Sequence, residues 1–158
     1  MKRTILFSII LAFALVSCKK EVTKVVHEDA PEDTWGIVWE IQPEDWAADE
    51  DSTMLYASLD IPELTDAILD HGAVMVYLSF VDGEYEAIPQ VFDYVSYRSV
   101  NYKGGTDIIM RDIDGYFPPK PKGEIWAKVV LIDAVKLSKH PDVNLLNYEE
   151  VKRMFHQD

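Results

Sequence analysis

The sequence predicts a mainly β protein whose domain is an antiparallel β-sandwich of immunoglobulin-like or jelly-roll type. About seven short segments alternate apolar and polar residues, as half-buried strands do, and turn residues separate most of them. Only two short segments have helical spacing, so the regular alternation of strands and helices that defines a doubly wound sheet is missing. A partly open barrel is the alternative arrangement.

The predicted strands cover residues 35–41, 54–61, 73–81, 84–88, 92–102, 106–113 and 124–133. Trp35 and Trp39 share the inward face of the first strand. The third strand is the most apolar run of the folded part, which is typical of an interior strand. Asp82-Gly83 and Gly104-Gly105 are hairpin signals. Residues 116–123 form a proline-rich loop in which regular strand pairing is not expected.

Two short helices, one internal and one C-terminal, complete the predicted domain. Thr65 is placed as the N-cap of a helix of one to two turns, and Gly72 suits the left-handed position that ends such a helix. Near the C-terminus, Asn147 can cap a helix over residues 147–155, where apolar residues recur at helical spacing.

The N-terminus has the organisation of a signal peptide. Lys2 and Arg3 form a short positive head, and residues 5–16 are almost wholly apolar. A helix of that length spans roughly 18 Å, well short of the roughly 30 Å core of a bilayer. The segment is therefore too short for a stable membrane span and has the length of a signal-peptide core.

The stretch Leu15-Val16-Ser17-Cys18 resembles the lipobox of bacterial lipoprotein signal peptides, although Val16 is bulkier than the residue usual there. The resemblance implies cleavage before Cys18, followed by lipidation of its sulfur and of its new amino group. Several acyl chains together anchor a protein firmly in a membrane. The predicted organisation is a signal peptide at 1–17, the lipidated cysteine with a polar, flexible tether at 18–34, and a β-sandwich domain at 35–158.

The charge and the motifs of the chain exclude several classes of function. The sequence has 28 acidic and 15 basic residues, a formal charge of −13, which argues against nucleic acid as a partner. It has one cysteine and no glycine-rich phosphate loop, so neither a thiolate zinc site nor a nucleotide site is expected. No cofactor is predicted, and no catalytic motif indicates an enzyme.

The acidic residues of Glu44–Asp51 could supply oxygen ligands to calcium, but they do not have the spacing of a known calcium loop. A solvated acidic loop is the preferred interpretation, and Asp112-Ile113-Asp114-Gly115 is interpreted as a turn. The four histidines have neither the spacing of a helical metal site nor a neighbouring nucleophile motif. The sequence therefore predicts no metal site and no catalytic residues.

Aromatic residues outside the strand pattern are the remaining candidates for a binding site. Trp46 lies in the acidic loop and Tyr116 in the proline-rich loop, and neither fits the alternation of a strand. Exposed aromatic rings beside carboxylates can hold sugars or peptide segments. Trp46 and Tyr116 are therefore the predicted ligand-binding residues.

A second resemblance, to uncharacterised lipoproteins of Bacteroides-type bacteria, covers much of residues 35–133. It is carried by Trp35, Tyr56 and the strings 62–65, 68–72, 74–78, 88–89 and 128–132. It implies a lipid-anchored envelope protein, and it supplies no active-site residue. We expect outer-membrane attachment. In such bacteria, surface display is associated with acidic residues directly after the lipidated cysteine, and here Lys19 and Lys20 precede Glu21, so the periplasmic and the surface face both stay open. A glycan- or protein-binding module is the favoured function; a structural subunit of an envelope assembly and a hydrolase are the alternatives.

Overall fold

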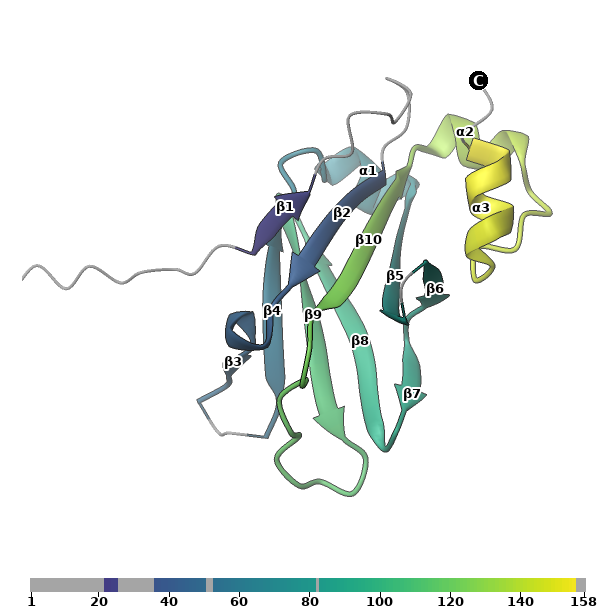
Figure 1. Cartoon of the computed structure of the whole chain (residues 1–158). Coiled ribbons are helices and arrows are strands. Elements are labelled where there is room, and N and C mark those ends of the chain that lie inside the picture. Colours follow the sequence, from purple (N-terminus) through teal and green to yellow (C-terminus); the bar gives the residue numbers. More distant parts are fainter. Residues whose placement is uncertain (1–21, 26–35, 51–52, 82, 156–158) are drawn as a thin grey trace, which may run out of the picture.

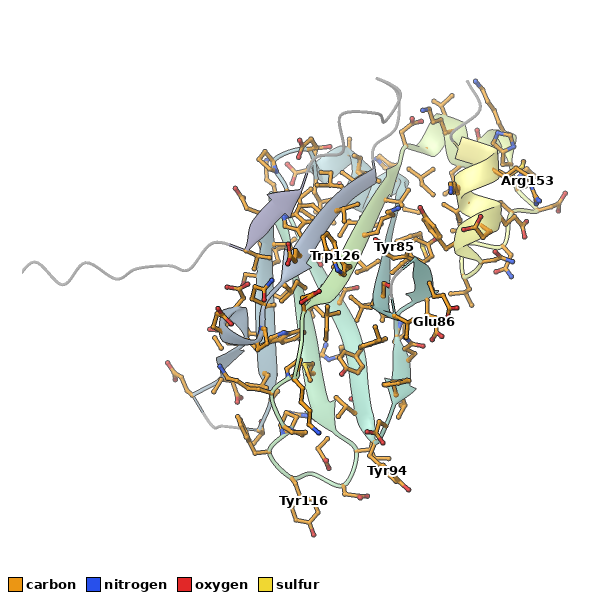
Figure 2. All side chains as sticks on the ribbon, in the orientation of Figure 1. Tyr85, Glu86, Tyr94, Tyr116, Trp126 and Arg153 are labelled. Atoms are coloured by element: carbon orange, nitrogen blue, oxygen red, sulfur yellow. The ribbon has the colours of Figure 1, made fainter. Side chains whose placement is uncertain are left out.

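The computed structural model describes residues 22–25, 36–50, 53–81 and 83–155 (Figure 1, with side chains in Figure 2). Three predicted features lie outside these ranges: the signal peptide at 1–17, the lipidation site Cys18, and Trp35, the first residue of the first predicted strand. The described residues contain two antiparallel sheets, one short 3-10 helix and three α-helices.

The two sheets pack face to face, which confirms the predicted β-sandwich (Figure 1). The first sheet contains, in spatial order, β1 (Thr23–Val25), β2 (Gly36–Ile41), β10 (Ile125–Ile132), β5 (Ala73–Val81) and β6 (Glu84–Ala87). The second contains β3 (Ala47–Ala48), β4 (Leu55–Asp60), β9 (Gly105–Asp112), β8 (Val95–Tyr102) and β7 (Gln90–Phe92). Every pair of neighbouring strands is antiparallel.

All seven predicted strands are present, and the described residues add the short strands β1, β3 and β7. Strand β1 pairs with β2, so the prediction of a flexible tether is wrong for residues 23–25. Strand β3 and the 3-10 helix η1 (Pro43–Asp45) lie within the predicted acidic loop. The predicted strand 92–102 is interrupted, because Asp93 and Tyr94 form a two-residue turn between β7 and β8.

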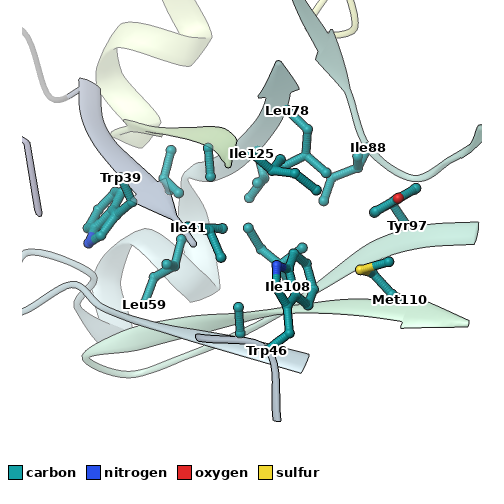
Figure 3. Close-up of a cluster of buried hydrophobic side chains, with 14 of the residues drawn as sticks. Trp39, Ile41, Trp46, Leu59, Leu78, Ile88, Tyr97, Ile108, Met110 and Ile125 are labelled. Carbon is teal, nitrogen blue, oxygen red and sulfur yellow. The ribbon is translucent and has the colours of Figure 1, made fainter. Parts of the chain in front are cut away.

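The main core fills the space between the sheets, and we call it the inter-sheet core (Figure 3). Its residues come from alternate positions of the long strands, which point toward the same face of a sheet. Among its most deeply buried members are Trp39, Ile41, Leu59, Leu78 and Ile108. This alternation explains why the strand predictions succeeded.

Helix α1 (Asp66–His71) begins after Thr65, as predicted, but it does not end as predicted. The φ of Gly72 is −98°, which is not left-handed. Glycine is required there for space instead, because a Cβ at this position would lie 2.3 Å from the carbonyl oxygen of Ile132. The chain therefore passes tightly from α1 against β10 before it enters β5.

The C-terminal segment covers part of the outer face of the first sheet (Figure 1). Helix α2 (Ala134–Lys139) was not predicted; the Asp133 carboxylate caps it by accepting from the N–H groups of Val135 and Lys136, at 2.8 and 2.9 Å. Helix α3 (Tyr148–Phe155) confirms the predicted C-terminal helix. The Asn147 side chain accepts from the Glu150 N–H at 3.1 Å, which confirms Asn147 as its cap.

This segment creates a second hydrophobic cluster, which we call the outer core. Its buried residues are Tyr77, Val130, Ile132, Tyr148 and Val151. The first three point outward from β5 and β10, and the last two come from α3. The first sheet is therefore buried on both faces in this region, which explains the nearly continuous apolar runs of β5 and β10.

Candidate functional site

The two aromatic residues predicted from the sequence have opposite environments. Trp46 is only 1% exposed and belongs to the inter-sheet core (Figure 3). The expectation that Trp46 stands exposed for a ligand is therefore wrong, because the loop after η1 folds its indole inward. Tyr116 is 73% exposed, as its position in the proline-rich loop led us to expect.

Tyr116 belongs to a group of exposed apolar side chains at one end of the sandwich, which we call the aromatic tip. Its members are Tyr94, Ile113, Tyr116 and Phe117, with exposed fractions of 67, 52, 73 and 48%. Figure 2 shows Tyr94 and Tyr116 at the end of the molecule opposite α1. Single exposed apolar residues are ordinary, whereas a group of them commonly marks a contact surface.

Two loops build the aromatic tip and are joined by a backbone hydrogen bond. Tyr94 lies in the β7–β8 turn, and the other three residues lie between β9 and β10. The Ile113 N–H donates to the Tyr94 carbonyl oxygen at 3.0 Å. Because β8 and β9 are also paired along their length, the two loops are held side by side. The β7–β8 turn and the start of the β9–β10 loop are therefore held together at the end of the sheet.

The backbone of Tyr94 is in an unfavourable conformation. Asp93 and Tyr94 have φ values of 47° and 66°, as a type I′ turn requires, and such turns favour Asp-Gly or Asn-Gly. A left-handed conformation costs a residue other than glycine roughly 1–2 kcal/mol. The tyrosine ring is mostly exposed, so burial offsets little of this cost. The fold alone gives no reason for tyrosine at position 94.

Carboxylates accompany the aromatic rings of the tip. Asp93 precedes Tyr94 in the turn, and Asp112 and Asp114 flank Ile113. The Asp112 carboxylate accepts from the Asp114 N–H at 2.8 Å, and Gly115 has a φ of 84°. These features confirm the predicted turn at residues 112–115. The tip thus combines apolar ring faces with oxygen atoms that accept hydrogen bonds.

The acidic loop has a structural role that accounts for its central carboxylate. Asp49 accepts from the N–H groups of Thr53 and Met54 at 2.7 and 3.1 Å. Desolvation acts to raise the pKa of Asp49, but these hydrogen bonds outweigh it and hold the pKa below its ordinary value. Within the described part of the chain, no group of three or more His, Cys, Asp or Glu residues is arranged to hold a metal ion.

A second surface feature, which we call the side groove, lies between β6 and the start of α3. Its volume is about 620 Å³, and its lining comes from residues 83–87, 89–90, 144 and 146–149. The rings of Tyr85 and Tyr148 lie 5.1 Å apart. The Lys128 ammonium lies 4.5 and 4.6 Å from their centroids and donates to the Tyr148 hydroxyl.

The surroundings of Lys128 indicate that its positive charge has a structural role. Desolvation, followed by repulsion from Lys152, lowers the pKa of Lys128, while Glu149 acts in the opposite sense. Contact with two aromatic rings offsets part of the cost of partial burial. Lys128 thereby stabilises the positions of Tyr85 and Tyr148, which form one wall of the side groove.

Comparison of the chain with protein-family models, with curated proteins and with solved structures finds no match. Among the described residues, no helix is both long enough and apolar enough to cross a membrane.

The sequence pattern identified one member of the aromatic tip, Tyr116, and missed the importance of Tyr94. Tyr94 was assigned to a continuous strand, because residues 92–102 are rich in strand-forming residues. The only local sign of the turn is Asp93, which strands disfavour. Neither Asp93 nor Tyr94 is a glycine, so the usual sequence signature of a type I′ turn is absent.

Proposed function

We propose that this chain is a lipid-anchored cell-envelope protein whose β-sandwich binds a glycan through the aromatic tip. The observation that carries the proposal is the pair of exposed tyrosines, Tyr94 and Tyr116, at one end of the sandwich. Tyr94 stands at a position where glycine would suit the backbone better, which favours a role for its side chain in binding.

The chemistry of the tip suits a carbohydrate. Tyrosine rings offer flat apolar faces to the C–H groups of a sugar and keep a hydroxyl for hydrogen bonding. The carboxylates of Asp93, Asp112 and Asp114 can accept hydrogen bonds from sugar hydroxyl groups. A neutral glycan also avoids the repulsion that the net charge of −13 would impose on an anionic ligand.

The lipid anchor is supported by the sequence alone, through the short apolar segment and the stretch that ends at Cys18. Expression with a clickable fatty acid should label the natural chain, and Cys18→Ala should abolish that label. A label that persists in the Cys18→Ala variant would contradict lipidation at this residue.

Glycan-array screening of the full-length chain tests the proposed binding. Tyr116→Ala should weaken binding to any retained glycan by about tenfold or more, because truncation of an aromatic anchor in a binding surface commonly costs more than about 1 kcal/mol. Tyr102→Ala is the matched control, since Tyr102 is also exposed but lies at the other end of β8. Equal binding by the natural chain and Tyr116→Ala, or no glycan bound at all, would overturn the proposal.

A further inference from the structure

We propose that the side groove binds an extended, positively charged peptide segment of a partner protein, which adds a strand to the free edge of β6. This site is separate from the aromatic tip and does not depend on the glycan proposal. Four observations carry it: the position and size of the groove, the orientation of the β6 backbone, an unpaired side-chain donor in the groove and the charge of the lining.

The side groove has the position and size needed for an added strand. Strand β6 is an edge strand of the first sheet, and α3 with the loop before it forms the opposite wall. The groove has a volume of about 620 Å³. Peptides commonly bind other proteins by extending an exposed sheet edge in this way.

The backbone of β6 presents hydrogen-bonding groups to the groove. The Ile88 N–H donates to the Val76 carbonyl oxygen at 3.0 Å, and Ala87 pairs with Tyr77. Because hydrogen-bonded and non-hydrogen-bonded pairs alternate in an antiparallel ladder, the N–H and C=O of Ala87 point away from β5. Ala87 is a lining residue, so these groups face the space that a peptide would enter.

A side-chain donor in the groove also lacks a partner. The Gln90 Nε2 atom is buried and, within the part of the chain that the structure describes, has no hydrogen-bond acceptor. Gln90 lines the groove where the edge passes from β6 toward β7. Buried polar atoms are normally satisfied, and a carbonyl oxygen of an added peptide would satisfy this one.

The charge of the lining selects the partner. Glu84, Glu86 and Glu149 line the groove, and no lysine or arginine is among its lining residues. Lys128 lies against the Tyr85 and Tyr148 rings of the groove wall, so the three carboxylates outnumber this cation. A second copy of the chain pairing through β6 would bring Glu84 and Glu86 of both copies together, and like charges opposite each other destabilise a sheet. A segment with lysine or arginine at alternate positions fits instead.

Fluorescence anisotropy with a labelled nine-residue peptide of alternating lysine and valine tests the inference on the full-length chain. We expect binding by the natural chain and a loss of about tenfold or more in the double variant Glu86→Gln, Glu149→Gln, since close charge pairs contribute strongly to association. Glu124→Gln, at an exposed position outside the groove, is the control and should leave the affinity unchanged. The variant Tyr116→Ala should also bind the peptide normally, which separates this test from that of the tip.

Backbone methylation distinguishes strand addition from simple charge attraction. Two further peptides carry N-methyl groups on either the odd or the even residues. Because only alternate residues of an added strand direct their N–H groups to β6, one methylated peptide should lose binding and the other should retain it. Equal affinity of the two methylated peptides, or no binding of the unmodified peptide, would overturn the inference.

Discussion

The inter-sheet core and the outer core contain different types of residue, although both include side chains of β5 and β10. The inter-sheet core is mostly aliphatic, with residues drawn from both sheets. The outer core has five buried residues, two of which are tyrosines, and it is closed by a short C-terminal helix. Beside it lies the half-buried ammonium group of Lys128.

This difference separates two roles within one domain. Aliphatic packing between long strands is non-directional and supplies most of the stability of a sandwich. The outer core depends more on directional contacts, such as the bond from the Tyr77 hydroxyl to the Leu145 carbonyl oxygen at 2.7 Å. We therefore expect the C-terminal segment to open locally at a lower free energy than the two sheets.

Truncation of a buried residue in each core should give the largest contrast. Leu78→Ala should lower the free energy of unfolding by about 2–5 kcal/mol, because it leaves a cavity between the sheets. Val151→Ala removes less volume and should cost about 1.5 kcal/mol. Both values can be measured by urea denaturation. A larger loss for Val151→Ala than for Leu78→Ala would reverse the proposed ranking of the two cores.

A hydroxyl deletion sharpens the same contrast. Tyr77→Phe removes the hydrogen bond to Leu145 and should cost about 1 kcal/mol. Hydrogen exchange should become faster in residues 143–155 while β4, β8 and β9 keep their protection. Tyr102→Phe is the control, because its hydroxyl bonds to Asp107 in an exposed position. Uniform acceleration across both sheets would show that the two regions unfold as one unit.

High pH should lower the stability of both cores, because each contains a buried tyrosine that resists deprotonation. Of the three predictions, this one should distinguish the two cores least. Burial, and then the charge of Asp93, raises the pKa of Tyr97 to about 12. Burial, followed by Tyr85 and Glu149, raises the pKa of Tyr148 to about 12. The ordinary value is 10.0, so the unfolded chain loses these protons first and stability should fall as the pH rises from 10 toward 12.

Substitution assigns this pH dependence to each core. Tyr97→Phe and Tyr148→Phe should each flatten the fall in unfolding free energy, measured by denaturation at several pH values. Lys128 has a lowered pKa and acts in the opposite direction up to the ordinary lysine value of 10.5, so the range above pH 10.5 is the most informative. An unchanged slope in both variants would contradict the role given to these hydroxyls.

The sequence could predict the sandwich because its strands leave a strong period-two pattern. Leu55, Ala57 and Leu59 alternate with less buried residues and lie in the inter-sheet core. The pattern fails where a strand is buried on both faces, as in β10. There, the apolar run predicts the strand correctly but does not show that a C-terminal helix covers its outer side.

The candidate site was less predictable, since it depends on where loops fold. Trp46 and Tyr116 look alike in sequence, as single aromatic residues in polar loops, yet one is buried and the other exposed. Nothing local distinguishes them, because the burial of Trp46 depends on how the loop before β3 packs against both sheets. The side groove joins residues 83–90 to 144–149, a juxtaposition that only the tertiary structure creates.

The most direct test of the central claim is to measure stability and glycan binding on the single variant Tyr94→Gly. The substitution creates an Asp-Gly turn, which suits the positive φ values at both positions. If Tyr94 serves binding at a cost to the fold, the variant should unfold with a free energy up to about 1 kcal/mol higher and bind the glycan retained by the natural chain about tenfold more weakly. A variant that is less stable than the natural chain, or one that binds the glycan equally well, would contradict the account.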